Sequence, residues 1–387
     1  MGAESVTKVF RTEKTVKSLL LANSKAVNVS VSGYLEIVFY NNVVYVTRGL
    51  AEKKAVPAQI SRKDYKTRIL EILEESTKKI PEEVEQFSTL IEKIGLRCRM
   101  LMFSKLECSP ELAARFGRKS PEFSAPILFE YEKQLLLTKL ELYSYKKNQV
   151  EYFYGNRIQK GLMNEIIVTC LGAYDKSHFL EGFELFSEEI GLISNRKKFL
   201  FGGDEHFVEA VETVLENKMF RYEGTRDCTY FISEEQEKLV LNAELKPLPE
   251  GYVLGSATVE DAQIITKTWK WNSPGEEDHT RQKLSAFPSS CVRFQGAPVA
   301  FEMVHPNGML NHLYVLEEHR GKGLGHIVEQ DLCQKLIRKK FAVYKNIEEE
   351  NGSLIKQTNA SPFWTLSTKQ DGAPLYRIYM AVWPSSN

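Results

Sequence analysis

The chain contains 387 residues, of which 43% are hydrophobic and 26% are charged, a globular composition in a chain too long for one typical core. Its 51 basic and 51 acidic side chains give zero net charge, which excludes a global field that would recruit nucleic acid or an acidic membrane. No apolar run approaches the roughly 20 residues of a membrane span. The six scattered cysteines contain no C-x-x-C pair, so the sequence indicates a reducing compartment and predicts no metal site.

The first third of the sequence predicts mixed α/β structure without a catalytic motif. Its β-branched and aromatic runs around Asn41-Asn42 are typical of a hairpin, because asparagine tolerates the positive φ of a tight turn. The expected elements are a hairpin, two helices and a short strand over residues 35–47, 63–79, 81–94 and 97–103. Since residues 120–126 have the composition of a linker, we expect residues 1–120 to form an N-terminal extension.

Residues 121–246 predict half of an α/β unit with no phosphate-binding loop of its own. The expected order is a buried strand, two helices and a strand over residues 165–171, 177–190, 205–216 and 228–232. Gly202-Gly203 is interpreted as a turn before the second helix. A change of composition at Lys246-Pro-Leu-Pro-Glu-Gly251 marks the next boundary, so the last domain is expected over residues 247–387.

The last domain predicts two helices, an antiparallel meander, a long helix and further short elements. Thr258 and Asp261 have the spacing of a capping box that begins the first helix. The meander is joined by turn-forming residues at Gln295-Gly296 and Asn307-Gly308. The expected elements are helices over 258–271 and 276–287, strands over 291–294, 299–304 and 309–315, a helix to 339, a short strand over 341–345, a short helix from 351 onward, and a last strand over 377–382.

A glycine-rich loop joins the third strand of the meander to the long helix. Arg320, Gly323 and Gly325 fit the pattern Arg-x-x-Gly-x-Gly, and Gly321 and Lys322 lie within it. Glycines let the backbone approach a ligand, and the unpaired N–H groups at a helix N-terminus favour an anion, so the loop predicts a pyrophosphate site. The alternative interpretation is that Arg320 and Lys322 are ordinary solvated charges on the surface.

Two other phosphate motifs are excluded. A dinucleotide fingerprint would need a glycine at position 326, where His326 stands, and it would follow a βαβ unit rather than an antiparallel meander. A Walker A loop would need Gly-Lys followed by serine or threonine, which the loop lacks.

This order of elements resembles the GNAT superfamily of acyl-CoA N-acyltransferases, and the segments between residues 247 and 360 resemble the glycine N-acyltransferase family. The segments that carry the resemblance include Glu318-His-Arg-Gly-Lys-Gly-Leu-Gly325, Phe287-Pro-Ser-Ser-Cys-Val292, Gly296-Ala-Pro-Val299 and Glu350-Asn351. The resemblance implies a GNAT fold in residues 247–387 and a GNAT-like half without cofactor in residues 121–246. Residues 1–120 match no family segment.

The family resemblance also implies the roles of individual residues. The backbone of Gly321, Lys322, Gly323, Leu324 and Gly325, with Arg320 at its mouth, would hold the coenzyme A pyrophosphate. The strand backbone at Leu313, Tyr314 and Val315 would pair with the pantetheine arm and polarise the thioester carbonyl. Asn351 matches the family's asparagine beside the coenzyme.

One position departs from the family pattern. The family's general base is a glutamate at the start of the strand before the loop, and the corresponding residue, eleven positions before Arg320, is Met309. Methionine cannot accept a proton. Three interpretations stay open: His305 or His312 serves as the base, with His312 expected on the face opposite Met309; no protein base is used; or the chain binds coenzyme A without catalysis.

The resemblance implies an acyl-CoA-dependent N-acyltransferase that uses a small amino acid, glycine by default, as acceptor, in the mitochondrion or otherwise the cytoplasm. The expected partners are an acyl-CoA donor and a small amine or amino acid acceptor, with no nucleic acid and no membrane span, and the oligomeric state stays open. A non-catalytic coenzyme A-binding protein and a protein lysine acetyltransferase remain alternative functions.

Overall fold

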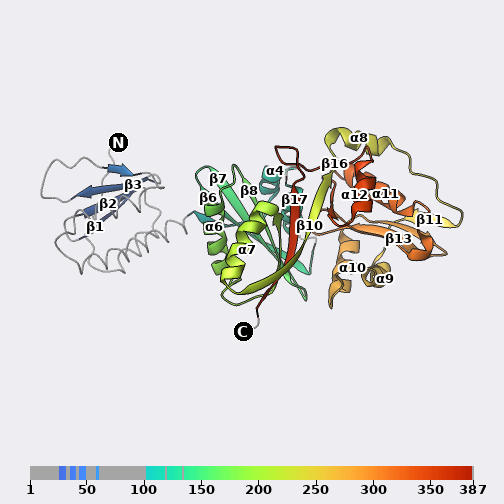
Figure 1. Cartoon of the computed structure of the whole chain (residues 1–387), viewed down its shortest axis with the longest axis horizontal. Coiled ribbons are helices and arrows are strands. Elements are labelled where there is room, and N and C mark those ends of the chain that lie inside the picture. Colours follow the sequence, from blue (N-terminus) through green and yellow to red (C-terminus); the bar gives the residue numbers. More distant parts are fainter. Residues whose placement is uncertain are drawn as a thin grey trace. The chain divides into compact units, whose positions relative to one another are not determined.

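The computed structural model describes residues 26–31, 35–40, 43–48, 58–60, 102–117, 120–132 and 135–385. The chain divides into two compact units, Met1–Met100 and Leu101–Asn387 (Figure 1). The helices predicted between residues 63 and 94 lie outside the described residues. So does the strand predicted over 97–103, except for its last two residues.

The first unit contains a four-stranded antiparallel sheet in the order β1-β2-β3-β4. Its strands are β1 (Ala26–Val31), β2 (Leu35–Tyr40), β3 (Val43–Arg48) and β4 (Ala58–Ile60). The pairing of β2 with β3 confirms the hairpin predicted at residues 35–47.

The second unit is built on one sheet with the strand order β11-β12-β13-β14-β15-β10-β17-β9-β8-β7-β6-β5, in which β16 also pairs with β10. The strands, in chain order, are β5 (Phe103–Leu106), β6 (Thr138–Lys147), β7 (Val150–Gln159), β8 (Asn164–Leu171), β9 (Phe199–Asp204), β10 (Phe220–Phe231), β11 (Tyr252–Gly255), β12 (Ser290–Phe294), β13 (Ala297–Val304), β14 (Leu310–Val315), β15 (Tyr344–Glu348), β16 (Thr365–Leu366) and β17 (Tyr376–Pro384). The helices are α4 (Pro110–Phe116), α5 (Pro121–Tyr131), α6 (Lys176–Glu189), α7 (Glu205–Asn217), α8 (Glu234–Asn242), α9 (Ala262–Lys267), α10 (Glu276–Ala286), α11 (Leu324–Arg338) and α12 (Gly352–Asn359).

The same connectivity occurs twice in this unit. The first repeat, β6 to β10, and the second repeat, β12 to β17, each consist of an antiparallel meander, a helix, a parallel strand, a helix and a final antiparallel strand. The final strands are exchanged: β10 of the first repeat pairs with β15, and β17 of the second repeat pairs with β9. Figure 1 shows β10 and β17 side by side in the middle of the sheet. Residues from both repeats therefore contribute to each half of the sheet.

Two local predictions are wrong. The segment 120–126 is the start of helix α5 rather than a linker, because Pro121 occupies the first helical position, where its missing N–H costs nothing, and Phe123 is buried. Gly202 and Gly203 lie within strand β9 rather than in a turn. A Cβ at Gly202 would stand 2.9 Å from the Tyr379 ring, so the glycine permits close packing of β9 against β17.

The two faces of the sheet in the second repeat carry different helices. Helix α11 covers one face, where Leu324 and Val328 pack on Val292, Val299 and Ala300. Helices α9 and α10 lie on the other side of β13 (Figure 1), where Phe301 and Met303 pack against Ala262, Ile265 and Leu284. Residues of the candidate site lie on both faces of this part of the sheet.

Candidate functional site

The N-terminus of α11 is open in the second repeat. Gly323 precedes the helix with φ 75°, and no side chain caps the first turn. Gly321 has φ 77°, a left-handed conformation that glycine adopts at little cost. The first-turn N–H groups, which no helical carbonyl can satisfy, thus face a loop without side-chain acceptors. This geometry suits a phosphate group.

The cationic side chains of the loop, Arg320 and Lys322, each donate a hydrogen bond to a nearby backbone carbonyl. Arg320 Nε donates to the carbonyl of Val315 over 3.1 Å, and its guanidinium lies 5.6 Å from the Tyr314 ring centre. Lys322 Nζ donates to the carbonyl of Glu318 over 3.1 Å. Both side chains are exposed, so each can also turn to an anion at the start of α11.

The C-terminal part of β14 has an open edge inside the sheet. β14 and β15 run parallel and pair at Leu310 and Lys345, and no further pair between them follows in the part of the chain that the structure describes. Leu316 N donates to Val299 O on β13 over 2.9 Å, so the backbone groups of the preceding residue, Val315, point the other way, toward β15. Backbone donors and acceptors without a strand partner favour an extended ligand that supplies its own.

A β-bulge causes this opening. On β13 and β14, Phe301 pairs with Tyr314 but Met303 pairs with Asn311, so two residues of β14 stand opposite one residue of β13. His312, one of the two, has φ 61°. A bulge bends its strand and increases the local twist, which turns the end of β14 away from β15.

The bulge also moves His312 to an unexpected face. Simple alternation places His312 opposite Met309, but the extra residue returns it to the side of Phe301 and Tyr314, whose ring centres lie 5.5 and 6.2 Å away. The expectation that His312 and Met309 lie on opposite faces is therefore wrong. Both lie on the side of the sheet that α9 and α10 cover.

His312 is held as a neutral side chain. The Thr268 hydroxyl donates to Ile265 O over 2.8 Å and lies 3.0 Å from Nε2 of His312, so the ring nitrogen is the donor of that second contact. Nδ1 is then unprotonated and has no hydrogen-bond partner. Burial, followed by the nearby charge of Lys283, lowers the pKa of His312 to about 3. A base with this pKa accepts a proton poorly at neutral pH.

His305 is also poorly placed to accept a proton. Its Nδ1 accepts the backbone N–H of Asn307 over 3.3 Å, and its Nε2 lies 3.5 Å from a guanidinium nitrogen of Arg157. Burial, followed by the charges of Arg157 and Lys283, lowers the pKa of His305 well below its ordinary value. A catalytic role for either histidine stays a prediction, and this geometry does not favour it.

Met309 faces a group of polar side chains on β10, β15 and β17. Asn346 Nδ2 lies 3.6 Å from the sulfur of Met309 and donates to the Tyr379 hydroxyl over 3.0 Å. Thr229 Oγ1 donates to Asn346 Oδ1 over 2.8 Å. On the same face of β10, two residues before Thr229, lies the buried carboxylate of Asp227. The position where the family has its glutamate therefore lies beside polar groups from three other strands.

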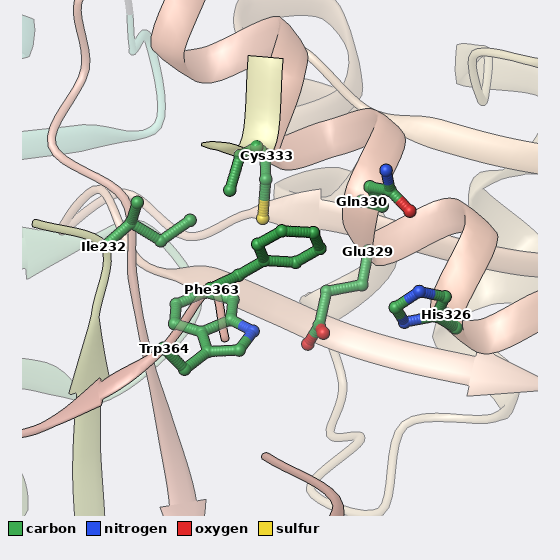
Figure 2. A pocket seen from close by; sticks show the side chains of 8 residues that line it. Ile232, His326, Glu329, Gln330, Cys333, Phe363 and Trp364 are labelled. Atoms are coloured by element: carbon green, nitrogen blue, oxygen red, sulfur yellow. The ribbon is translucent and has the colours of Figure 1, made fainter. Parts of the chain in front are cut away.

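On the opposite face, a small cavity lies against α11. Figure 2 shows His326, Glu329 and Cys333 on the helix, with Phe363 and Trp364 across from them. Glu329 is paired with Lys345 of β15, whose ammonium lies 4.2 Å from the Trp364 ring centre. The space has room for about one water molecule, so it flanks the helix rather than forming a substrate pocket.

Comparison with known proteins agrees with this geometry. No family model matches the chain. The chain is 22% identical to bovine (Bos taurus) glycine N-acyltransferase over 217 residues, which cover 48% of the chain and 72% of that protein. It is 24% identical to the Pongo abelii and human enzymes over 164 residues and spans about half the length of each, 55%. The crystal structure of a Drosophila protein matches 74% of the chain and 99% of its own length, with a TM-score of 0.59 and 12% identity.

The chain is similar to glycine N-acyltransferases over about half of its length. Its mixed α/β structure has the GNAT fold expected from the sequence. A tandem GNAT protein of clavulanic acid biosynthesis also aligns with 73% of the chain, at 13% identity and a TM-score of 0.45. At the level of the family, the sequence similarity to glycine N-acyltransferases supports acyl transfer.

The structure brings some predicted site residues together and separates others. One continuous segment, from the end of β14 through the glycine loop to the start of α11, contains most of the predicted coenzyme residues: Leu313, Tyr314, Val315 and residues 320–325. Asn351 caps α12, where its Oδ1 accepts the Leu354 N–H over 3.3 Å. Its role beside the coenzyme stays a prediction.

Beside the candidate site lie polar residues that sequence reasoning missed. Asp227 and Asn346 come from strands whose predicted bounds were wrong, since β10 begins at Phe220 rather than 228 and β15 ends at Glu348 rather than 345. A charged residue inside an otherwise strand-like run, as in Arg226-Asp227-Cys228-Thr229, was the available signal. Within the described residues, no cluster of His, Cys, Asp and Glu could hold a metal, and no helix is long and apolar enough to cross a membrane.

Proposed function

We propose that this chain transfers an acyl group from acyl-coenzyme A to the amino group of a small amino acid. One observation carries the proposal: the open edge of β14 leads directly into the uncapped N-terminus of α11. An extended ligand with amide groups and a terminal pyrophosphate matches both features, and pantetheine joined to a pyrophosphate is such a ligand. The similarity to glycine N-acyltransferases supports glycine as the first acceptor to test.

In this proposal the chain's own groups bind and orient the donor. The amides of the loop and of the first turn of α11 hold the pyrophosphate, and the side chains of Arg320 and Lys322 add positive charge beside it. The backbone groups of β14 that point toward β15 pair with the pantetheine amides. A backbone N–H beside the bulge then donates to the thioester carbonyl, where negative charge develops during attack.

The acceptor would approach from the side of the sheet opposite α11. Its amine attacks the thioester carbon and forms the C–N bond, the C–S bond breaks, and its electron pair leaves on the coenzyme A sulfur. The amine attacks only when it is neutral, so a group that removes its proton accelerates the reaction.

A second candidate function, binding of coenzyme A without catalysis, is favoured by Met309, which stands where the family has its general base. No observation favours lysine acetylation of a protein in the same way.

The test is release of free thiol from acetyl-, butyryl- and benzoyl-coenzyme A with glycine, alanine, glutamine or no acceptor, with the N-acyl product identified by mass spectrometry. We expect turnover that depends on a small α-amino acid. Tight binding of coenzyme A with no acceptor-dependent thiol release would instead support the non-catalytic function. Turnover only with lysine-containing peptides would overturn the amino acid acceptor.

A further inference from the structure

We propose that Asp227, on a strand supplied by the first repeat, is the general base that takes the proton of the acceptor amine. This inference rests on the proposed function. It explains how a chain with methionine at position 309 could retain a protein base: the carboxylate comes from β10 instead of β14.

The register of the sheet aligns Asp227 with the open part of β14. Leu310 and Lys345 are partners in parallel strands, and the bulge adds one residue to β14, so four residues further along β14 and three further along β15 Tyr314 is level with Glu348. Glu348 in turn is the cross-strand partner of Asp227. Asp227, Glu348 and the bulged region of β14 therefore lie on one line across the sheet. Because β14 is not paired with β15 beyond Leu310, the unpaired interval between these two strands also lies on this line.

Asp227 is buried and incompletely hydrogen-bonded. The residue is 8% exposed, and its Oδ1 has no hydrogen-bond partner. Burial of a carboxylate oxygen without a partner costs stability, so such an atom usually has a function or a missing ligand. An acceptor amine or a water molecule held by that amine would be the missing donor.

The charged groups around Asp227 come from every neighbouring element. Burial, with a smaller contribution from the negative charge of Glu348 on β15, raises the pKa of Asp227 from 3.8 to about 6. A hydrogen bond from Thr225 and the positive charges of Lys270, after α9, and Arg377, on β17, oppose this shift. The Tyr379 side chain of β17 lies in the same polar group. At neutral pH the carboxylate is thus ionised but more basic than an exposed aspartate, which suits a general base.

The other carboxylates of this face are already engaged. Both oxygens of Glu348 contact the ammonium of Lys270. Arg377 is paired with Glu122 and Asp204. Asp227 is the carboxylate of this group that retains an oxygen without a partner, which distinguishes it from Glu348 as the proton acceptor.

The proton balance of the step is simple. The acceptor enters as an ammonium and gives one proton to Asp227, directly or through one water, and the carboxyl later releases that proton to solvent. The neutral amine attacks, and as the C–S bond breaks its second proton passes to the departing thiolate. The products are an amide, free coenzyme A and one solvent proton.

The experiment compares wild type with Asp227→Asn in the full chain, using acetyl-coenzyme A and glycine between pH 5 and 9. We expect wild-type kcat/KM to rise with pH through an apparent pKa near 6, and Asp227→Asn to lose about 10²- to 10⁴-fold in kcat while its Kd for coenzyme A changes little. Asp227→Glu should recover part of the rate, because it restores a carboxylate with a different reach.

Two further variants separate catalysis from structure. Glu348→Gln removes a negative neighbour that raises the pKa of Asp227, so the acid limb of the profile should move to lower pH. Glu349→Gln, beside it in sequence but exposed, is the matched control and should leave the profile unchanged. Thermal unfolding checks folding: since the pKa of Asp227 is raised in the folded state, ionised Asp227 destabilises the fold above pH 6, and Asp227→Asn should unfold at a temperature no lower than wild type at pH 8.

Two outcomes are distinguishable. If wild type does not turn over with any acceptor, the proposed function fails. If wild type turns over and folded Asp227→Asn keeps its kcat and pH profile, the assignment of Asp227 is overturned while the proposed function stands.

Discussion

The two repeats of the second unit have the same connectivity, yet their central strands differ. In the first repeat, β7 and β8 pair in one uninterrupted register from Glu151 and Leu171 to Arg157 and Glu165, and β8 then pairs with β9 at four successive positions. In the second repeat, the register of β13 and β14 shifts by one residue, and β14 and β15 pair at one position. The second repeat, in which β14 and β15 are largely unpaired, thus differs from the paired first repeat by one extra residue in the strand before the helix.

The helices that follow these strands differ in the same sense. Helix α6 is capped by Asp175, whose carboxylate accepts the N–H of His178 over 3.0 Å and the hydroxyl of Ser177 over 2.6 Å. Helix α11 follows Gly323, which provides no side-chain cap. The first repeat therefore fills its own anion site with its own carboxylate, whereas the second leaves it free.

The repeated fold alone does not make a coenzyme site. A regular strand and an acidic cap make one repeat a structural partner. A bulged strand and a glycine cap give the other the geometry of a binding site. The last strand of the first repeat carries Asp227 into the sheet of the second, where we propose that it serves this site.

The largest effect is expected from giving α11 the cap of α6. Gly323→Asp places a carboxylate where the pyrophosphate would bind, and we expect Kd for coenzyme A to rise about 100-fold. Gly323→Asn is the matched control of equal size without charge, and asparagine tolerates the positive φ, so its loss should be about 10-fold. Isothermal titration at low and high salt measures both. Equal losses that do not depend on salt would contradict an anion site at this helix.

The bulge can be tested at His312. Valine is strained at φ 61° and asparagine is not, while both lose the ring packing 4.7 Å from Trp269. We therefore expect His312→Val to have a free energy of unfolding about 1–2 kcal/mol below that of His312→Asn, and a lower kcat/KM. Denaturant unfolding and the thiol-release assay measure these differences. If folded His312→Asn loses about 100-fold or more in kcat while Asp227→Asn keeps its kcat, the imidazole rather than Asp227 acts as the base.

A smaller effect is expected from the exposed cations of the loop. Replacing both Arg320 and Lys322 with alanine removes two charges near the pyrophosphate but none of the backbone donors, so we expect Kd for coenzyme A to rise about 5-fold. The salt dependence of Kd should weaken in parallel. Unchanged affinity at low salt would mean that both side chains are ordinary surface charges.

The smallest effect is expected from removing the cap of the first repeat. Asp175→Ala should lower the free energy of unfolding by about 1 kcal/mol, the usual contribution of an N-cap. It should not create a second coenzyme A site, because β8 and β9 remain paired. Titration with coenzyme A should still give one molecule per chain. Binding of two molecules of coenzyme A per chain would show that the Asp175 cap alone prevents binding to the first repeat.

Much of the fold could be predicted because its signals are local. The meander β12 to β14, its Gln295-Gly296 turn and helix α11 follow from alternation, turn residues and helical periodicity within short stretches. The Thr258–Asp261 capping box is present as expected. Strand β9 was missed because its two glycines read as a turn, and only their contacts with Tyr379 and Val168 explain them.

The sequence by itself determined the glycine loop, its helix and the absence of a base at position 309, since each depends on the identity of neighbouring residues. Only the tertiary structure decided that β14 is bulged, that its edge is open and that Asp227 lies on the face of Met309. The physical reason is that pairing register and strand exchange depend on backbone hydrogen bonds between distant segments, which no local pattern of residues records.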